Sequence, residues 1–238
     1  AQNMHTFSTR AHKNGHLDPY LQLQSNLQTM HIDQAHTKTT GKNISIAMID
    51  TGVDLEHPDL IGQISQNKNF AETISNGFSH DKHGTAVAGI MVAKKDNGTG
   101  IAGIAPDAKV IALKACWPEQ PDAIEAVCNS FTLAMAIDTA IKSGAKILNM
   151  SLSGPQDALL ELLLNKAIAE GMIVVTADNG HGQTDDNFPA SLKSVIAVQS
   201  VKQGSGDSRQ ASTLTAPGDK ILTTLPYGTY DFISGSSI

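Results

Sequence analysis

The stretch SIAMIDTGVDLEHPDL, residues 45–60, joins an apolar run to a polar turn. Its first five residues are small or apolar, and a run of this kind is typical of a strand buried on both faces of a sheet. The run ends at Asp50, and the Thr51-Gly52 pair that follows indicates a turn. We therefore expect the strand to deliver one carboxylate to the edge of a sheet, in a poorly solvated place.

The rest of the chain alternates between apolar strands and segments of helical period. The predicted strands are 43–50, 108–115, 145–151, 172–177 and 194–201, and the predicted helices are 84–93, 127–144 and 157–171. This alternation is typical of an α/β fold, so we predict a three-layer αβα sandwich with a mostly parallel sheet. Residues 213–235 predict a turn and a hairpin at their Pro-Gly and Tyr-Gly pairs. We expect 1–238 to be one domain, with 1–19 as an N-terminal arm.

Composition narrows the class of protein. The 238 residues are 40% hydrophobic and 17% charged, with a net charge of −6, which argues against a nucleic-acid surface. No apolar run approaches the length of about 18 residues that spans a membrane. Cys116 and Cys128 flank a loop with two prolines. This favours a disulfide over two free thiols, and hence an exported protein whose leader has been removed.

Three other classes of protein are rejected on sequence grounds: an aspartic protease, a metal-dependent hydrolase and a nucleotide-binding domain. An aspartic protease needs a second Asp-Thr/Ser-Gly loop on a β-rich lobe, and neither Asp207 nor Asp219 is followed by those residues. The nine histidines show no H-E-x-x-H or similar metal-ligand spacing. A nucleotide-binding domain would carry a G-x-G-x-x-G or phosphate loop after the first strand, and the chain has none.

A nucleophile, a base and an orienting acid are present in the order Asp50, His83, Ser237. They lie in IDTGVDLEHPDL, DKHGTAVAGI and FISGSSI. In this arrangement the serine hydroxyl attacks a carbonyl, the imidazole takes its proton, and the carboxylate fixes the imidazole tautomer. Taken singly, Asp50 and His83 would more often be structural residues.

Several stretches together resemble the subtilisin-like serine proteases, the subtilases, from about residue 17 to the end. They are IAMIDTGVDLEHPDL, HGTAVAGI, GIAGIAPDAKVIALK, ILNMSLSGP and FPASLKSVIAV, with the closing SGSSI. The resemblance implies a subtilisin-like fold and a serine endopeptidase that works through an acyl-enzyme. It favours Ser237 over the neighbouring Ser236 as nucleophile and places Ser237 at the start of a helix.

The resemblance also implies the residues around the triad. Asn179 would be the oxyanion donor, although Asn-Gly alone also reads as a plain turn. Ser151, Leu152, Ser153 and Gly154 would bind the substrate backbone, and Asn187 would lie near the base of the pocket for the cleaved residue. Asp185 and Asp186 beside it raise the option of a basic residue there, or they face solvent. The Cys116–Cys128 loop would form a wall of the pockets for earlier substrate residues.

A structural calcium ion is the implied cofactor, because KKDNGTGIAG at 94–103 resembles the calcium loop of the family. The implied ligands are hard oxygens from three segments, as calcium requires: Asp18, Asp59, Lys94, Asn97, Thr99 and Ile101. The alternative is a set of ordinary turn residues.

Two departures qualify the resemblance. Asp178 stands where the family has a small residue, and an inward carboxylate would oppose the anionic transition state. The sequence also stops one residue after Ser237, where the family continues into a buried helix, so we expect part of the fold to be missing and 238 residues alone not to be competent.

The main expectation is a secreted or periplasmic monomer that acts on polypeptides and is accompanied by a pro-domain or protein inhibitor. The alternative is a catalytically impaired peptide-binding module with the same fold.

Overall fold

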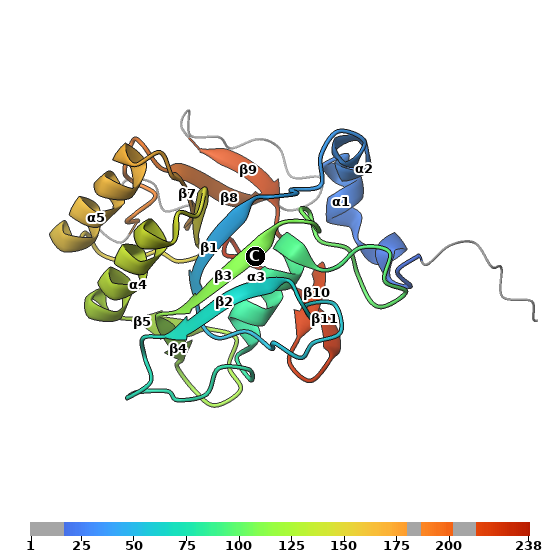
Figure 1. Cartoon of the computed structure of the whole chain (residues 1–238), viewed down its shortest axis with the longest axis horizontal. Helices are drawn as coiled ribbons and strands as arrows, with labels where there is room; N and C mark the ends of the chain where they lie inside the picture. Colours follow the sequence, from blue (N-terminus) through green and yellow to red (C-terminus); the bar gives the residue numbers. More distant parts are fainter. Residues whose placement is uncertain (1–16, 180–186, 202–212) are drawn as a thin grey trace, which may run out of the picture.

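A computed structural model of the chain describes residues 17–179, 187–201 and 213–238 (Figure 1). Its centre is a sheet of seven strands in the order β2-β3-β1-β6-β7-β8-β9, and every neighbouring pair is parallel. The strands are β1 (Ser45–Asp50), β2 (Ile64–Asn69), β3 (Lys109–Lys114), β6 (Ile147–Met150), β7 (Ile173–Asp178), β8 (Ile196–Val201) and β9 (Leu214–Pro217). The predicted α/β class with a parallel sheet is confirmed.

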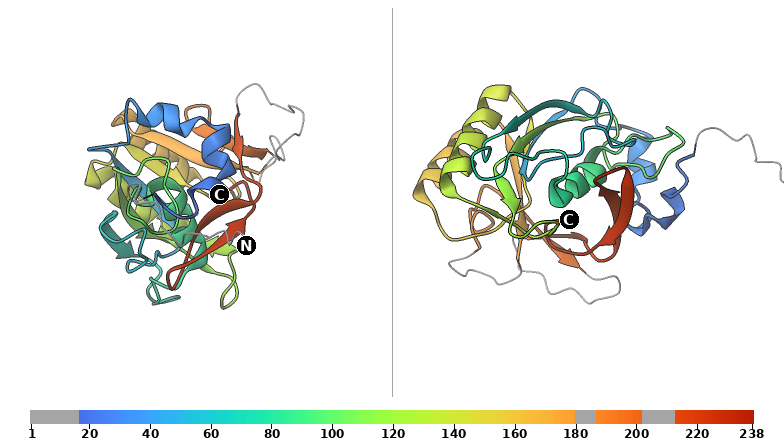
Figure 2. Two further views of the ribbon diagram at one scale, coloured as in Figure 1. Left: turned by 90° about the vertical axis from the view of Figure 1, so that its right-hand side faces the viewer. Right: turned by 90° about the horizontal axis from the view of Figure 1, so that it is seen from below.

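Helices cover both faces of this sheet, because side chains alternate along each strand. Ala47 and Ile49 of β1 pack with α4 (Ser130–Ser143) and α5 (Ala158–Ala169). Ile46 and Met48 face the other way and pack with α3 (Lys82–Val92). Figure 2 shows α4 and α5 on one side of the sheet, and α3 with the hairpin β10–β11 on the other. The three layers are therefore those expected.

The helix ends follow local sequence rules. Asn129 caps α4 by accepting the Thr132 N–H at 2.8 Å, and Asp157 caps α5 by accepting the N–H groups of Leu159 and Leu160. Gly144, directly after α4, has φ 70°, the left-handed conformation that glycine adopts without strain. Both helices thus end near the residues that the sequence indicates.

Some elements differ from the prediction. The helix expected from residue 127 starts at Ser130, because β5 (Ala126–Cys128) pairs antiparallel with β4 (Cys116–Pro118). The polar strand β2 was not anticipated; it lies at an edge of the sheet, where its polar residues reach water. Residues 236 and 237 form a turn, and the helix that the resemblance implies from Ser237 onward stays a prediction.

The remaining elements frame these layers. Short helices η1 (Leu21–Leu23), α1 (Ser25–Thr29) and α2 (Ile32–His36) precede β1. The predicted C-terminal hairpin consists of β10 (Ile221–Leu225) and β11 (Thr229–Ile233), with positive φ at Tyr227 and Gly228 in its turn. Among the described residues, no helix combines the length and apolar character needed to cross a bilayer.

Candidate active site

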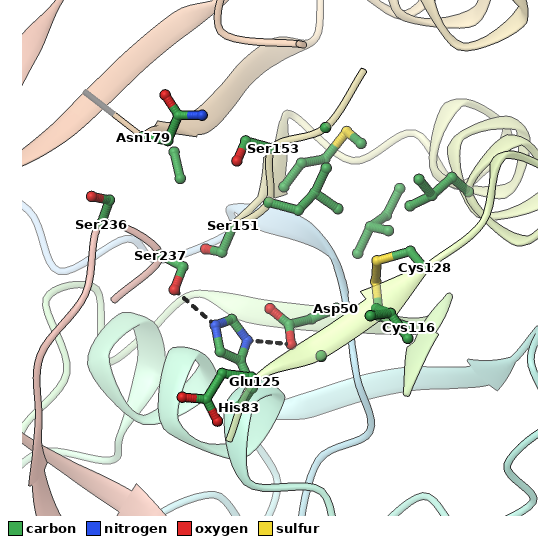
Figure 3. A pocket seen from close by; sticks show the side chains of 18 of the residues that line it. Asp50, His83, Cys116, Glu125, Cys128, Ser151, Ser153, Asn179, Ser236 and Ser237 are labelled. Carbon is green, nitrogen blue, oxygen red and sulfur yellow. Dashed lines mark hydrogen bonds and ion pairs between the residues drawn. A yellow bond between two sulfur atoms is a disulfide. The ribbon is translucent and has the colours of Figure 1, made fainter. Parts of the chain in front are cut away.

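Asp50, His83 and Ser237 meet in space although the chain separates them widely. Asp50 is the last residue of β1, His83 is the second residue of α3, and Ser237 follows β11. The imidazole Nδ1 lies 2.7 Å from Asp50 Oδ1, and Nε2 lies 3.0 Å from Ser237 Oγ (Figure 3). The imidazole therefore bridges a carboxylate and a hydroxyl, each within hydrogen-bond reach.

The surroundings of His83 raise the pKa of its imidazole. Burial alone would lower its pKa, but the charge of Asp50 and the hydrogen bond to it outweigh burial, so the pKa is raised above the ordinary 6.5. Asp50 is itself buried, at 3% exposure, and Oδ1 also accepts the Thr51 N–H at 2.7 Å. A carboxylate held in this way favours the tautomer with the proton on Nδ1, which leaves Nε2 free to accept the Ser237 proton.

Close backbone contact fixes the distance between Asp50 and His83. A Cβ on Gly84 would lie 2.5 Å from the Gly52 carbonyl oxygen and 2.8 Å from that of Thr51. Only glycine therefore lets α3 approach the turn after β1 this closely. The Gly84 N–H also donates to Thr51 Oγ1 at 2.9 Å, which ties the helix to the turn.

A buried ion pair supports the same junction, and the sequence analysis missed it. Asp81 Oδ2 accepts the Gly52 N–H at 2.7 Å and lies 2.5 Å from Lys114 Nζ, at the end of β3. The Lys114 side chain is fully buried and also donates to the Gly77 carbonyl at 2.6 Å and to Ser75 Oγ at 3.1 Å. Four hydrogen bonds thus connect the turn after Asp50, the start of α3, the end of β3 and residues 75 and 77.

An open cleft of about 790 Å³ runs past the three residues. Among the residues that line it are Asp50, His83, Ser236, Ser237, Asn179, the segment 151–157, the segment 124–130 and Phe188. Four of the five residues expected to bind substrate are in this lining, namely Ser151, Leu152, Ser153 and Gly154. The cleft is long enough for several residues of an extended peptide, which would run beside the segment after β6.

The expectation that Asn187 lies near the base of the pocket stays a prediction. Asn187 is not among the described residues that line the cleft, and it is buried at 5% exposure. Its Oδ1 lies 3.4 Å from the Asn179 backbone nitrogen, which donates to it. The neighbouring Phe188 reaches the cleft instead and pairs with Gly154 through two backbone hydrogen bonds of 2.9 and 3.0 Å. Asp185 and Asp186 lie outside the described residues.

Asp178 points away from the cleft. Along β7 the side chains alternate, so Ala177 and Asn179 line the cleft and Asp178 does not. Its buried carboxylate accepts the hydroxyl of Thr213 at 3.0 Å and contacts the Asn187 amide nitrogen at 3.4 Å. The carboxylate is thus hydrogen-bonded outside the cleft lining, so Asp178 gives no reason to expect an impaired site.

The hairpin β4–β5 forms the wall of the cleft opposite the segment 151–157. Cys116 and Cys128 are register partners in it and are joined by a disulfide in the structure. Figure 3 shows Glu125, on the same hairpin, beside His83. The resemblance anticipated a wall here, but it gave no signal for Glu125, which has no motif around it.

The residues expected to bind calcium converge from three segments. Asp18 and Asp59 are buried, at 3% and 0% exposure. Asp18 accepts the N–H groups of Asp96 and Asn97, and Asp59 accepts the Asn97 side-chain amide at 2.9 Å. Burial, with a further contribution from the Asp59 charge, raises the pKa of Asp18, as expected of two carboxylates in one buried place.

This donor set fits a calcium ion. Among the described residues, no three His, Cys, Asp or Glu side chains lie close enough together to hold a metal ion. A cation here would therefore be bound by two carboxylates and by neutral oxygens. In the described part of the chain, no hydrogen-bond donor reaches the backbone carbonyls of Lys94, Thr99 or Ile101. Hard oxygens with spare lone pairs beside buried carboxylates are what calcium coordinates.

Comparisons with known proteins agree with this geometry. The model of the subtilase family matches residues 41–238. Thermitase of Thermoactinomyces vulgaris is 34% identical over 228 residues, which cover 93% of this chain and 80% of thermitase. The major intracellular serine protease of Bacillus subtilis is 36% identical, covering 83% of this chain and 65% of that protein. Subtilisin E of the same organism is 31% identical, with 84% and 53% covered.

A solved structure is also similar. The prenylagaramide maturation protease PagA superposes with a TM-score of 0.70 at 25% identity, over 87% of this chain and 74% of that one. The chain thus spans between about half and four fifths of the length of these proteins.

Proposed function

Because this chain belongs to the subtilase family, we propose that it provides the catalytic domain, residues 1–238, of a serine endopeptidase. One observation carries the proposal: His83 lies between Asp50 and Ser237 at 2.7 and 3.0 Å, at the wall of a peptide-sized cleft. No observation favours the impaired peptide-binding module.

The proposed reaction follows from these positions. Ser237 Oγ attacks the carbonyl carbon of the scissile peptide bond while His83 Nε2 takes its proton, and an oxyanion forms. The Asn179 amide and the Ser237 N–H stabilise that oxyanion, and the buried Asp50 carboxylate stabilises the imidazolium. His83 then gives the proton to the departing amine, and a water molecule, activated by the same imidazole, hydrolyses the acyl-enzyme.

A serine-directed fluorophosphonate, applied to the complete protein, tests the proposal directly. We expect it to label Ser237, located by mass mapping, and to abolish hydrolysis of a fluorogenic peptide library. Ser236→Ala is the matched control, because Ser236 also lines the cleft but contacts neither His83 nor Asp50; this variant should still be labelled. Labelling at Ser236 alone, or none at all, would overturn the assignment.

Structural calcium is proposed for the site of Asp18, Asp59, Asn97 and the carbonyls of Lys94, Thr99 and Ile101. When bound, the ion would supply positive charge to two buried carboxylates and tie residue 18 to the loop 94–101. We expect Tm to rise with added Ca²⁺ and to fall with a chelator, by mass action. Asp59→Asn should remove that dependence, and the exposed Asp138→Asn should keep it.

The proposed location rests on one observation, the disulfide, and the proposed partners follow from the proposed function. The Cys116–Cys128 bond supports an oxidising compartment, secreted or periplasmic, although two relatives carry "intracellular" in their names. We propose a polypeptide substrate, a pro-domain or protein inhibitor that occupies the cleft, and a monomer. Cell fractionation with thiol labelling tests the first point: a reduced, cytoplasmic protein would contradict it.

A further inference from the structure

The cleft carries negative charge beyond that of the triad. Among the residues that the structure describes, its lining contains no Lys or Arg, and its titratable side chains besides Asp50 and His83 are Glu125 and Asp157. In the described part of the chain neither acid forms an ion pair. Asp157 is held as the cap of α5, with its pKa lowered by the Ser130 hydroxyl and backbone N–H groups. Glu125 has no such role.

Glu125 is placed firmly and close to the chemistry. It lies on the hairpin β4–β5, whose base is closed by the disulfide and whose tip is closed by a hydrogen bond from the Glu119 N–H to the Glu125 carbonyl. Figure 3 shows its carboxylate beside His83, and its charge contributes to the raised pKa of that imidazole. Within the described residues, no donor reaches this carboxylate, so it is free to meet a ligand.

The geometry of an extended substrate brings one particular side chain to Glu125. The proposed substrate strand runs between the segment 151–154 and the hairpin, and side chains alternate along any strand. In this proposed binding mode the side chain of the cleaved residue would enter the cleft near Gly154 and Phe188. The side chain of the residue before it would then point the opposite way, toward His83 and the hairpin.

We propose that Glu125 is a specificity-determining residue that selects polypeptides with Lys or Arg immediately before the cleaved residue. This inference rests on the proposed endopeptidase function. A cationic side chain is expected at that substrate position because, in the described part of the chain, Glu125 is a carboxylate without an ion-pair partner and the cleft lining supplies no Lys or Arg to pair with it. Glu125 is exposed in the absence of substrate, and a cation placed beside it gains Coulomb energy that salt screens.

Matched peptides that differ only at this position provide the test. One carries Lys and the other norleucine, which keeps the four-carbon side chain but lacks the ammonium group. We expect kcat/KM to favour Lys by about fivefold to tenfold, and NaCl to reduce the ratio. Glu125→Gln should bring the ratio to about one. Glu119→Gln makes the same charge change on the same hairpin, outside the cleft, and should keep the ratio.

The outcomes separate the two proposals. If the wild type cuts the two peptides with equal kcat/KM, or if Glu125→Gln keeps the preference for Lys, the role of Glu125 is overturned. The endopeptidase function stands in either case, because both peptides are still hydrolysed. Failure to cut either peptide, together with no fluorophosphonate labelling of Ser237, overturns the endopeptidase function and this inference with it.

Discussion

Lys114 and Asp81 form an ion pair closed off from water, with Nζ 2.5 Å from the carboxylate and the lysine side chain fully buried. Lys114 ends β3 and Asp81 directly precedes α3, so the pair joins the sheet to the helix that carries His83. Asp81 also binds the Gly52 N–H, two residues after Asp50. The pair therefore supports the place where the turn after β1 meets the start of α3, and the contact between Asp50 and His83 depends on that place.

Removing one partner of this pair should be costly. We expect Lys114→Met to lower the free energy of unfolding by about 3–5 kcal/mol, because it leaves a buried carboxylate without its counter-charge. Urea unfolding measures the loss. Lys142→Met is the control, since Lys142 forms an exposed pair with Asp138 at the same 2.5 Å and should matter by at most about 1 kcal/mol. Equal losses in the two variants would contradict this view of Lys114.

Asp50→Asn tests the orienting role of the carboxylate. The amide oxygen can still accept the Thr51 N–H, so we expect the fold to persist. The imidazole tautomer is no longer fixed, and kcat should fall by about 10⁴-fold. Stopped-time peptide hydrolysis gives the rate, and circular dichroism checks the fold. A near-normal kcat in a folded variant would remove Asp50 from the mechanism.

The raised pKa of His83 predicts how activity depends on pH. The imidazole must be neutral to accept the Ser237 proton, so kcat/KM should rise with pH through a midpoint above 6.5. The same shift affects stability. A folded-state pKa above the unfolded value contributes stability that is fully present below about 6.5 and is lost as pH rises through the raised value.

NMR titration of the imidazole provides the measurement for this prediction. Asp50→Asn should move the midpoint downward, because it removes the charge that outweighs burial. A midpoint below 6.5 in the wild type would show that burial dominates after all.

Asn179→Ala tests the oxyanion donor. We expect kcat to fall by about 100- to 1000-fold with little change in KM, because the amide would bind only the charge that develops in the transition state. Asn149→Ala provides a comparison, since that amide binds Ser151 Oγ at 3.1 Å and does not line the cleft. A rise in KM at constant kcat would assign Asn179 to ground-state binding.

The disulfide makes a separate prediction for stability. Cys116 and Cys128 are 12 positions apart, and closing a loop of this size contributes about 3 kcal/mol in the chain-entropy model. The double variant Cys116→Ser/Cys128→Ser should lose that amount, and reduced wild-type protein should match it in urea unfolding. A reduced protein as stable as the oxidised one would show that the hairpin holds without the bond.

The sequence predicted the features that have strong local signals. Buried strands such as β1 and helices closed by glycine were found because their patterns are local. The polar edge strand β2 lacked the apolar pattern that marks a strand. The hairpin β4–β5 is too short to show any periodicity.

The candidate site divides in the same way. Asp50, His83 and Ser237 could be named because each lies in a recognisable motif. Lys114 could not, because a lysine at the end of a strand normally reaches solvent, and its burial depends on Asp81, 33 positions away. Asn187 was placed by resemblance near a pocket base, which stays a prediction; its contact with the Asn179 backbone N–H had no signal in the sequence.

The parallel sheet also determines at which stage of folding the active site forms. Asp50, the segment after Met150 and Asn179 stand at the carboxyl ends of three adjacent elements of the sheet, and Ser237 reaches His83 across 154 positions of chain. No short stretch holds even two members of the triad, so a nascent or partly folded chain carries the residues without the site. A newly made chain therefore cannot cleave other polypeptides through this site until its tertiary structure is complete.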